Sequence, residues 1–199
     1  MDNSADVLEV HSKQRKADTD HSDVVLRQGR FTVRHLSMTW PKLRLVWERL
    51  QEFRTLFSDL TKGDLDNFLR YIGNESTLWL EIWEEKRPNA PPELIGIFMC
   101  EGLHRVVDID AHILFFDRDV AGRVSVCKAI TAWLFATLPI QRITVEPSQL
   151  AYAAIRLVRN IGFKQEGKKR QALLLGGRWV DVYIFGLTRQ EAAHALSDR

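Results

Sequence analysis

The stretch RVVDIDAHILFFDRDVAGR, residues 105–123, decides how the rest of the chain is interpreted. It predicts a strand and a short turn, and the turn opens onto a helical pattern over residues 124–138. Side chains alternate along a strand, so one face is wholly apolar and belongs to the core: Val107, Ile109, Ala111, Ile113 and Phe115. The other face holds three ionisable groups in a row, between Val106 and Leu114: Asp108, Asp110 and His112. An interior strand tolerates such a row only where the groups have partners, so this face predicts a cleft.

Length and composition predict one globular domain with a sizeable core, because the 199 residues are 45% hydrophobic and 27% charged. The 28 Lys and Arg against 26 Asp and Glu give a net charge of +2, too balanced to indicate a nucleic-acid partner. Cys100 and Cys127 lie in apolar patterns and predict buried free thiols rather than a disulfide. With no signal-peptide pattern and no apolar run of membrane-spanning length, we expect a soluble cytoplasmic protein without a membrane partner.

The pattern of elements predicts an α/β fold. Residues 1–23 contain few apolar positions and predict a disordered or loosely attached tail, followed by one domain over residues 24–199. Strands are expected over residues 24–36 (with 24–26 as a separate edge strand in the alternative), 77–84, 94–101, 104–116, 140–145, 163–175 and 178–187. Helices are expected over residues 40–60, 65–72, 124–138 and 150–161, with a short terminal helix over 188–196. Together they predict a mixed sheet of about seven strands flanked by about four helices.

This order of elements resembles the GCN5-related N-acetyltransferase (GNAT) superfamily over residues 31–191. The sequence Ala-Ile-Arg-Leu at 154–157, followed by Ile-Gly-Phe at 161–163, is similar to the family's second signature, a helix that ends in Gly-Phe. Residues 166–170 and 177–183 are similar to the final hairpin of ribosomal-protein and aminoglycoside acetyltransferases. The resemblance implies acetyl-CoA as cosubstrate, no metal, and a primary amine of a protein or small molecule as acceptor.

The resemblance also implies a site for the cofactor. In the family the signature Q/R-x-x-G-x-G/A joins a strand to a helix, and its backbone N–H groups bind the pyrophosphate. The matching residues are 118–123, where Arg118 fits, Ala121 replaces a glycine, and Arg123 stands where Gly or Ala is expected. Arg123 either blocks the pyrophosphate or, pointing outward, pairs with it. The expected cofactor-binding residues are Leu114, Phe115, Phe116, Arg118, Val120, Ala121, Gly122, Arg123 and Val124.

Acetylation of an amine needs a base that takes the ammonium proton. The candidates are His112, Asp110 and Asp108 on the ionisable face, Glu101 on the preceding strand, and Glu146 after the strand at 140–145. In the alternative, the groups on the ionisable face form a polar network or face solvent. The family often has an Asn and a Tyr on its fourth helix, the Tyr protonating the leaving thiolate, but the matching positions hold Ala151 and Val158.

These departures leave a second hypothesis, a catalytically degenerate GNAT scaffold that serves as a binding or structural module. The chain also resembles GNAT-like proteins encoded in tailed-phage genomes, in the strand with His112 and in the final hairpin. That resemblance implies the cytoplasm of an infected host or a virion as the site of action. A homo-oligomer is a further expected assembly, and a component of the phage particle is the alternative if the phage resemblance holds.

Overall fold

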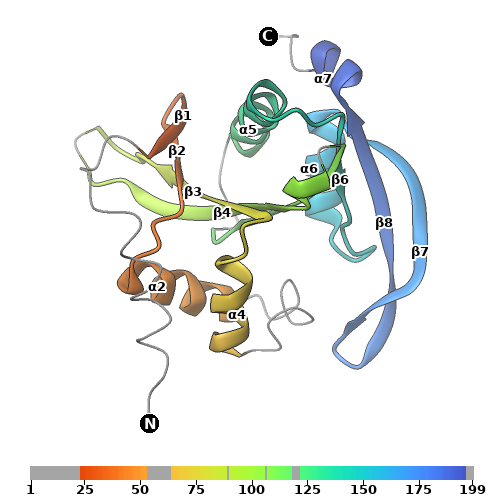
Figure 1. Cartoon of the computed structure of the whole chain (residues 1–199), viewed down its shortest axis with the longest axis horizontal. Helices are drawn as coiled ribbons and strands as arrows, with labels where there is room; N and C mark the ends of the chain where they lie inside the picture. The colour runs from red at the N-terminus through yellow and green to blue at the C-terminus, as the bar shows by residue number, and fades with distance from the viewer. Residues whose placement is uncertain (1–22, 53–63, 89, 106, 118–121, 196–199) are drawn as a thin grey trace.

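The computed structural model describes residues 23–52, 64–88, 90–105, 107–117 and 122–195. They form an eight-stranded sheet with helices on both faces (Figure 1). The strands are β1 (Val24–Gln28), β2 (Phe31–His35), β3 (Thr77–Glu84), β4 (Glu93–Glu101), β5 (Asp108–Phe115), β6 (Arg142–Val145), β7 (Lys164–Leu175) and β8 (Arg178–Thr188). The helices in these ranges are α2 (Trp40–Gln51), α4 (Leu65–Ile72), α5 (Arg123–Thr137), α6 (Tyr152–Ile161) and α7 (Arg189–Ala195), with a short 3-10 turn η1 (Leu103–Arg105).

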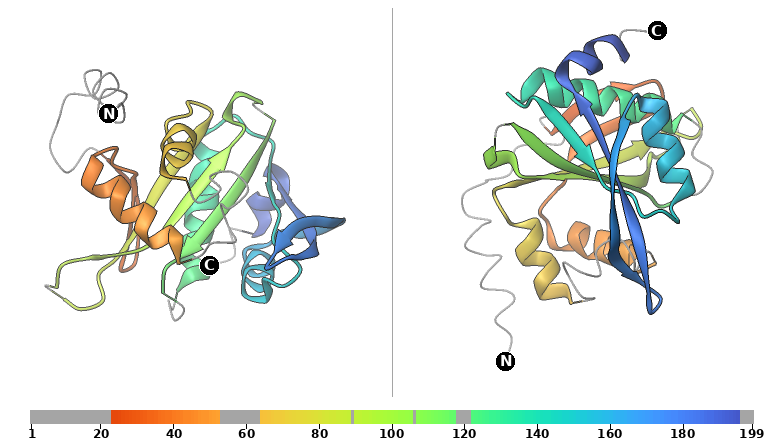
Figure 2. Two further views of the ribbon diagram at one scale, coloured as in Figure 1. Left: turned by 90° about the horizontal axis from the view of Figure 1, so that it is seen from below. Right: turned by 90° about the vertical axis from the view of Figure 1, so that its right-hand side faces the viewer.

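The sheet is mixed, as the sequence predicts. Strands β3, β4 and β5 form an antiparallel meander, and β6 runs parallel to β5 because α5 crosses over between them. Strand β8 lies between β6 and β7 and pairs antiparallel with both, so the order is β1-β2-β3-β4-β5-β6-β8-β7. The hairpin β7–β8 turns at Gly176 and Gly177, whose φ angles of 54° and 79° suit the primed turn expected there. Figure 2 shows this hairpin extending beyond the body of the sheet.

Several boundaries differ from the expected ones. Residues 24–36 form two strands because Gly29, with a φ of 55°, reverses the chain between β1 and β2, and the sheet therefore has eight strands instead of about seven. Strand β5 begins at Asp108 because residues 103–105 form η1. Five helices are described where about four were expected to flank the sheet. The tail predicted for residues 1–23 lies almost wholly outside the described residues, as do residues 53–60, the second half of the first predicted helix.

Strand β5 separates two apolar layers and confirms the two faces expected over residues 108–115, but Val107, expected in the core, precedes the strand and is 58% exposed. Ile109 and Ala111 are buried in the cluster that packs under α5 and α6. Leu114 lies on the opposite side, in the cluster formed with Leu43 of α2 and Phe68 of α4. Figure 1 shows α5 and α6 on one face of the sheet and α2 and α4 on the other. The ionisable face of β5 is thus the one that α4 covers.

Local signals set the ends of the helices. The carboxylate of Asp64 accepts hydrogen bonds from the backbone N–H groups of Asp66 (2.8 Å) and Asn67 (3.3 Å), which caps α4. Gly122, with a φ of 85°, precedes α5, and Gly162, with a φ of 120°, ends α6. Within the described ranges, these helices are too short or too polar to span a bilayer.

The C-terminal end of α5 is closed by Arg189, the first residue of α7. Its guanidinium donates to the carbonyl oxygens of Phe135 (2.5 Å), Leu138 (2.7 Å) and Ile140 (2.9 Å), and it lies over the Phe135 ring. The last carbonyls of a helix have no partner inside the helix, so this contact satisfies them. It also ties the end of β8 to the helix that crosses over between β5 and β6.

Candidate functional site

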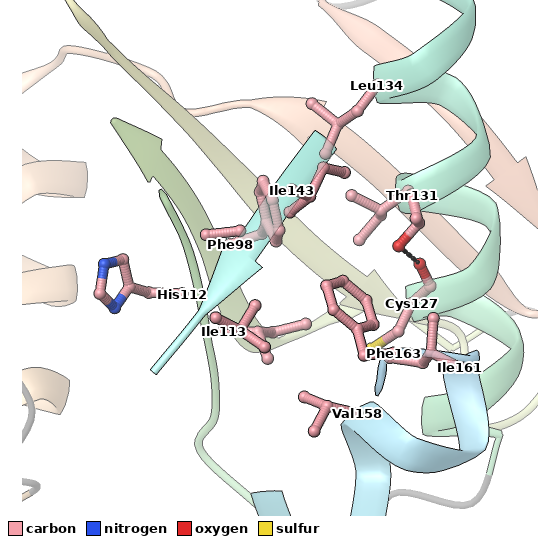
Figure 3. Close-up of a pocket in the computed structure, with 13 residues that line it drawn as sticks. Phe98, His112, Ile113, Cys127, Thr131, Leu134, Ile143, Val158, Ile161 and Phe163 are labelled. Atoms are coloured by element: carbon pink, nitrogen blue, oxygen red, sulfur yellow. Dashed lines mark hydrogen bonds between the residues drawn. The ribbon is translucent and has the colours of Figure 1, made fainter. Parts of the chain in front are cut away.

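Strands β5 and β6 pair over a short length and then separate. Residues 108–110 of β5 are opposite residues 142–144 of β6, although β5 continues to Phe115. A cavity of about 40 Å³ lies where the two strands diverge, between β4, β5, β6, α5 and α6 (Figure 3). Among the described residues, no backbone group pairs with the edge of β5 beyond residue 110 on the β6 side, so its amide groups there are available to a ligand.

The cavity is apolar. Its lining includes Phe98, Ile113, Ile143, Val158 and Phe163. Two polar side chains on α5 also line it, but the Thr131 hydroxyl donates to the Cys127 carbonyl at 2.8 Å, and burial raises the pKa of the Cys127 thiol to about 12. The lining of this cavity suits an alkyl or amide chain rather than a charged group.

On the opposite side of β5 lies an ionisable cluster, defined here as Tyr71, Glu101, Asp110 and His112. Figure 3 shows the His112 ring pointing away from the other labelled cavity residues, so only the backbone at this position borders the cavity. Glu101 and Asp110 are directly opposite each other across β4 and β5, and His112 Nε2 lies 3.8 Å from Glu101 Oε1. The structure therefore brings together three of the residues proposed from the sequence: Glu101, Asp110 and His112.

Tyr71 is the member of the cluster that sequence reasoning missed. Its hydroxyl donates to Glu101 Oε2 at 3.1 Å and lies 3.4 Å from the sulfur of Met99. Burial, and then the negative charge of Glu101, raise the pKa of Tyr71 above the ordinary range of a phenol. The spacing of α4 marks Tyr71 as a helical residue near the buried Phe68, but it carries no signal that the hydroxyl reaches β4.

Asp108 belongs to a different network. Its carboxylate accepts a hydrogen bond from Thr144 Oγ1 at 2.9 Å, and Arg142 Nε lies 3.4 Å away. Arg142 also pairs with Glu166 of β7, at 2.6 Å. This hydrogen bond, ahead of the nearby Asp108 charge, raises the pKa of Arg142 further. Asp108 thus links the start of β5 to both ends of its paired segment on β6, which is the polar-network alternative for this residue.

Glu146 lies just past the end of β6 and pairs with Lys169 of β7 at 2.5 Å. About 30% of its side chain is exposed. The contact links the loop after β6 to the long hairpin. A role for Glu146 in catalysis stays a prediction.

At the start of α5, the side chain of Arg123 lies across its own turn. Its guanidinium donates to the carbonyl oxygen of Asp117 and stacks over the ring of Phe115, 5.1 Å from the centroid. Lys86 Nζ lies 3.6 Å from the carboxylate of Asp117 and 2.7 Å from that of Glu93, so its charge is already paired with two carboxylates. No acidic residue occupies the first turn of α5. The guanidinium of Arg123 and the unpaired N–H groups of a helix N-terminus are favourable to an anion, whereas the carboxylate of Asp117 opposes it.

The other expected cofactor residues are spread over the same region. Leu114 is buried toward α2 and α4, while Phe116 and Val124 are half-buried. The backbone N–H of Phe116 donates to the carbonyl oxygen of Ile95, which holds the end of β5 against β4. Arg118, Val120 and Ala121 lie outside the described residues.

The positions matched to the family's Asn and Tyr are also defined. Ala151 is the N-cap of α6 and forms no side-chain cap. Val158 is buried and lines the cavity, so the side chain at the family's tyrosine position does point into the space between β5 and β6. Tyr152, on the same helix, is 75% exposed. The lining of this cavity therefore includes no phenol at the position where the family has one.

The sheet order, the parallel pair β5–β6 that separates around a cavity, and the helix that starts at a glycine turn after β5 match the GNAT-like fold expected from the sequence. No family model matches the chain, and no curated protein matches it in sequence.

Solved structures do match. A chimera of the spermidine N-acetyltransferase SpeG from Vibrio cholerae and hSSAT is 14% identical, covers 83% of this chain and 99% of its own, and has a TM-score of 0.68. The spermidine N-acetyltransferase from Vibrio cholerae in complex with CoA and spermine is 15% identical, with 82% and 98% covered and a TM-score of 0.67. A dodecameric structure of the Vibrio cholerae enzyme is 14% identical, with 81% and 95% covered and a TM-score of 0.66. At these identities the likeness concerns the fold.

Proposed function

We propose that the protein is an acetyl-CoA-dependent N-acetyltransferase that transfers an acetyl group to a primary amine. The observation that carries the proposal is the separation of β5 and β6. The separation opens an apolar cavity on one side of β5. The alternation of side chains along the strand puts the ionisable cluster on its other side. A thioester carried on an apolar arm and a cationic amine are the two reactants that such an arrangement suits.

The residues present fit acetyl-CoA. The pantetheine arm would extend along the edge of β5 and reach the cavity beside Ile113 and Val158 with one end only, since the cavity holds about 40 Å³. The pyrophosphate would lie at the N-terminus of α5, where Arg123 adds a positive charge. A structural relative was solved in complex with CoA and spermine, which supports acetyl-CoA as the cosubstrate.

The ionisable cluster would receive the acceptor. The carboxylates of Glu101 and Asp110 attract the ammonium form, and His112 takes its proton. The free amine then attacks the thioester carbonyl, so a C–N bond forms and the C–S bond breaks. A thiol has an ordinary pKa of about 8.5, so the CoA thiolate leaves without a dedicated acid. Asp108 and Glu146 remain weaker candidates for the base, because both are ion-paired.

Calorimetric titration with acetyl-CoA, with free CoA as a control, tests the proposal. Micromolar binding is expected, followed by acetylation of an amine from a panel that begins with spermidine and spermine, because structural relatives are spermidine acetyltransferases. The variant His112→Ala should bind acetyl-CoA normally and lose transfer. Absence of binding at millimolar acetyl-CoA would overturn the proposal.

Arg123 gives a sharper test of the cofactor site. Arg123→Ala is expected to weaken acetyl-CoA binding about tenfold at low salt, since a charge-assisted contact to phosphate is worth roughly 1.5 kcal/mol. Arg178→Ala, at the exposed tip of the hairpin, is the control. Tighter binding by Arg123→Ala would show that the guanidinium blocks the site.

A second candidate function is a binding or structural module without catalysis. Two observations favour it: Val158 occupies the tyrosine position, and Arg123 lies on its own turn. The resemblance to phage-encoded GNAT-like proteins would then point to an assembly partner in the host cytoplasm or a virion. The dodecameric structural relative supports a homo-oligomer under either proposal, and sedimentation of the purified protein tests it.

A further inference from the structure

The ionisable cluster joins a helix to a strand through one carboxylate. The Tyr71 hydroxyl donates to Glu101 Oε2 at 3.1 Å, while the other oxygen, Oε1, lies 3.8 Å from His112 Nε2. Each oxygen of Glu101 therefore faces a different neighbour. The phenol comes from α4 and the imidazole from β5. The Glu101 carboxylate, at the end of β4, therefore links a residue of the helix layer to a residue of the sheet.

The surroundings of Tyr71 fix its hydroxyl in place. Its ring packs against that of Trp79 in a T-shaped arrangement, with the ring centroids 5.7 Å apart and an interplanar angle of 86°. Its hydroxyl also lies 3.4 Å from Met99 Sδ. Helix α4 is itself capped by Asp64 at one end and closed at Gly73 at the other. A phenol held in this way fixes one oxygen of Glu101. The carboxylate therefore cannot rotate freely, and its other oxygen stays turned toward His112.

Tyr71 serves as a hydrogen-bond donor and not as an acid. Burial and the charges of Glu101 and Asp110 raise its pKa, so the phenol keeps its proton throughout the range in which an enzyme works. Such a weak acid does not transfer its proton to a leaving thiolate with an ordinary pKa. Its effect on the reaction must pass through the carboxylate that it contacts.

We propose that Tyr71 and Glu101 are positioning residues for His112. Tyr71 holds Glu101, and Glu101 directs the hydrogen of His112 to Nε2, which leaves the lone pair on Nδ1 for the proton of the acceptor ammonium. When Nδ1 takes that proton, the imidazolium forms beside the carboxylate, and no proton passes to Glu101 or Tyr71. The contact of 3.8 Å is longer than a hydrogen bond and shortens as the positive charge develops. The inference rests on the proposed function, in which His112 is the base.

Any test must distinguish the effect of the Glu101 carboxylate on Tyr71 from that of the Asp110 carboxylate. The ionisable groups that act on Tyr71 are Glu101 and Cys100 of β4 and Asp110 of β5. Burial raises the pKa of the Cys100 thiol to about 12, which removes it from the working range. Trp79, the contact from β3, carries no charge. The variants Glu101→Gln and Asp110→Asn therefore distinguish the two remaining groups.

The first measurement needs no cosubstrate. The Tyr71 13Cζ and His112 13Cε1 resonances are followed by NMR through a pH titration of the free protein, with His112→Ala to assign the ring. In the wild type the Tyr71 resonance should move with the same midpoint as His112, because both share Glu101. The movement should vanish in Glu101→Gln and persist in Asp110→Asn. A Tyr71 resonance that stays flat in the wild type, or still moves in Glu101→Gln, overturns the proposal.

The second measurement uses turnover. Tyr71→Phe keeps the ring on Trp79 and removes only the hydroxyl, so it should fold normally, lower kcat/KM about tenfold and shift the acidic limb of its pH profile. Tyr152→Phe, with a side chain in solvent, is the matched control and should change neither. Unchanged kcat/KM and profile in Tyr71→Phe would overturn the positioning role. Failure to bind acetyl-CoA would instead overturn the proposed function, and the NMR titration would still decide whether Tyr71, Glu101 and His112 are linked.

Discussion

Arg142 and Glu166 form an ion pair of 2.6 Å although a whole strand lies between them. Arg142 is on β6 and Glu166 on β7, and β8 separates these strands in the sheet. The pair crosses β8 at Gly186, which is opposite Thr144 on one side and Lys164 on the other. A Cβ atom at Gly186 would lie 2.6 Å from Arg142 Nη2 and would also overlap the Glu166 carboxylate. The missing side chain is what lets the pair form.

This relationship predicts that the effect of Gly186→Ala depends on Glu166. Alanine in a strand is favoured over glycine by roughly 0.5–1 kcal/mol, and displacing a partly exposed ion pair costs up to about 1 kcal/mol. In the wild type the two effects should offset each other, whereas in Glu166→Ala the substitution should stabilise the protein. Urea unfolding of the wild type, the two single variants and the double variant measures both changes. Equal changes in the two backgrounds would contradict the role assigned to Gly186.

Arg189 should be among the most important polar residues for stability. It donates to three carbonyls at the end of α5, and hydrogen bonds from a charged group are worth about 1.5–3 kcal/mol. Arg189→Ala should lower the free energy of unfolding by at least about 2 kcal/mol, with Arg189→Lys intermediate. Arg44→Ala, which removes an exposed pair with Glu48, should cost less than about 1 kcal/mol. Similar losses in Arg189→Ala and Arg44→Ala would refute the capping role.

Glu191 should make stability depend on pH in the acid range. It forms a capping box with Thr188 and pairs with Lys164 at 2.7 Å, and these contacts, Lys164 first, lower its pKa from 4.5 to about 2. Because the folded-state pKa is lowered, the stabilisation is complete above pH 4.5 and is lost as the pH falls toward about 2. Glu191→Gln should therefore be less stable than the wild type at pH 7, and the gap in Tm should close by pH 2. A constant gap would exclude this linkage.

The variant Val158→Tyr tests whether the lack of a tyrosine at this position limits the proposed reaction. The side chain lines the cavity at the position where family members often have tyrosine. Val158→Tyr should give a kcat about tenfold above that of Val158→Phe, since a positioned acid contributes at least that much. Both variants add a ring to the same cavity, so Val158→Phe controls for packing. Equal kcat values for the two would mean that protonation of the thiolate does not limit turnover.

The features that the sequence predicted well are local. The alternation of Asp108, Asp110 and His112 with apolar residues follows from strand geometry alone, and the structure confirms it. Gly162 and the Gly176–Gly177 turn are equally local signals, because each supplies a positive φ where the chain changes direction. The parallel pairing of β5 with β6 follows from the helix between them.

The features that the sequence did not predict depend on distant parts of the chain. Tyr71 and Glu101 are 30 residues apart, and nothing in either segment marks the contact between α4 and β4. The partners of Asp108 come from β6, so its place in a polar network and not in the cluster emerges only from the pairing register. The ionisable face was therefore predictable as a face, but its division into two networks was not.

The order of strands has a consequence for how the protein is made. Within the described residues, strand β6 is paired with β5 on one side and with β8 on the other. β8 ends at Thr188 and comes last in sequence among the described strands. On the ribosome, an edge of the growing sheet therefore stays open through the synthesis of α6, β7 and most of β8. The sheet closes only when the second arm of the hairpin has left the exit tunnel, so a pause in translation before that point would leave β6 exposed to association with other nascent chains.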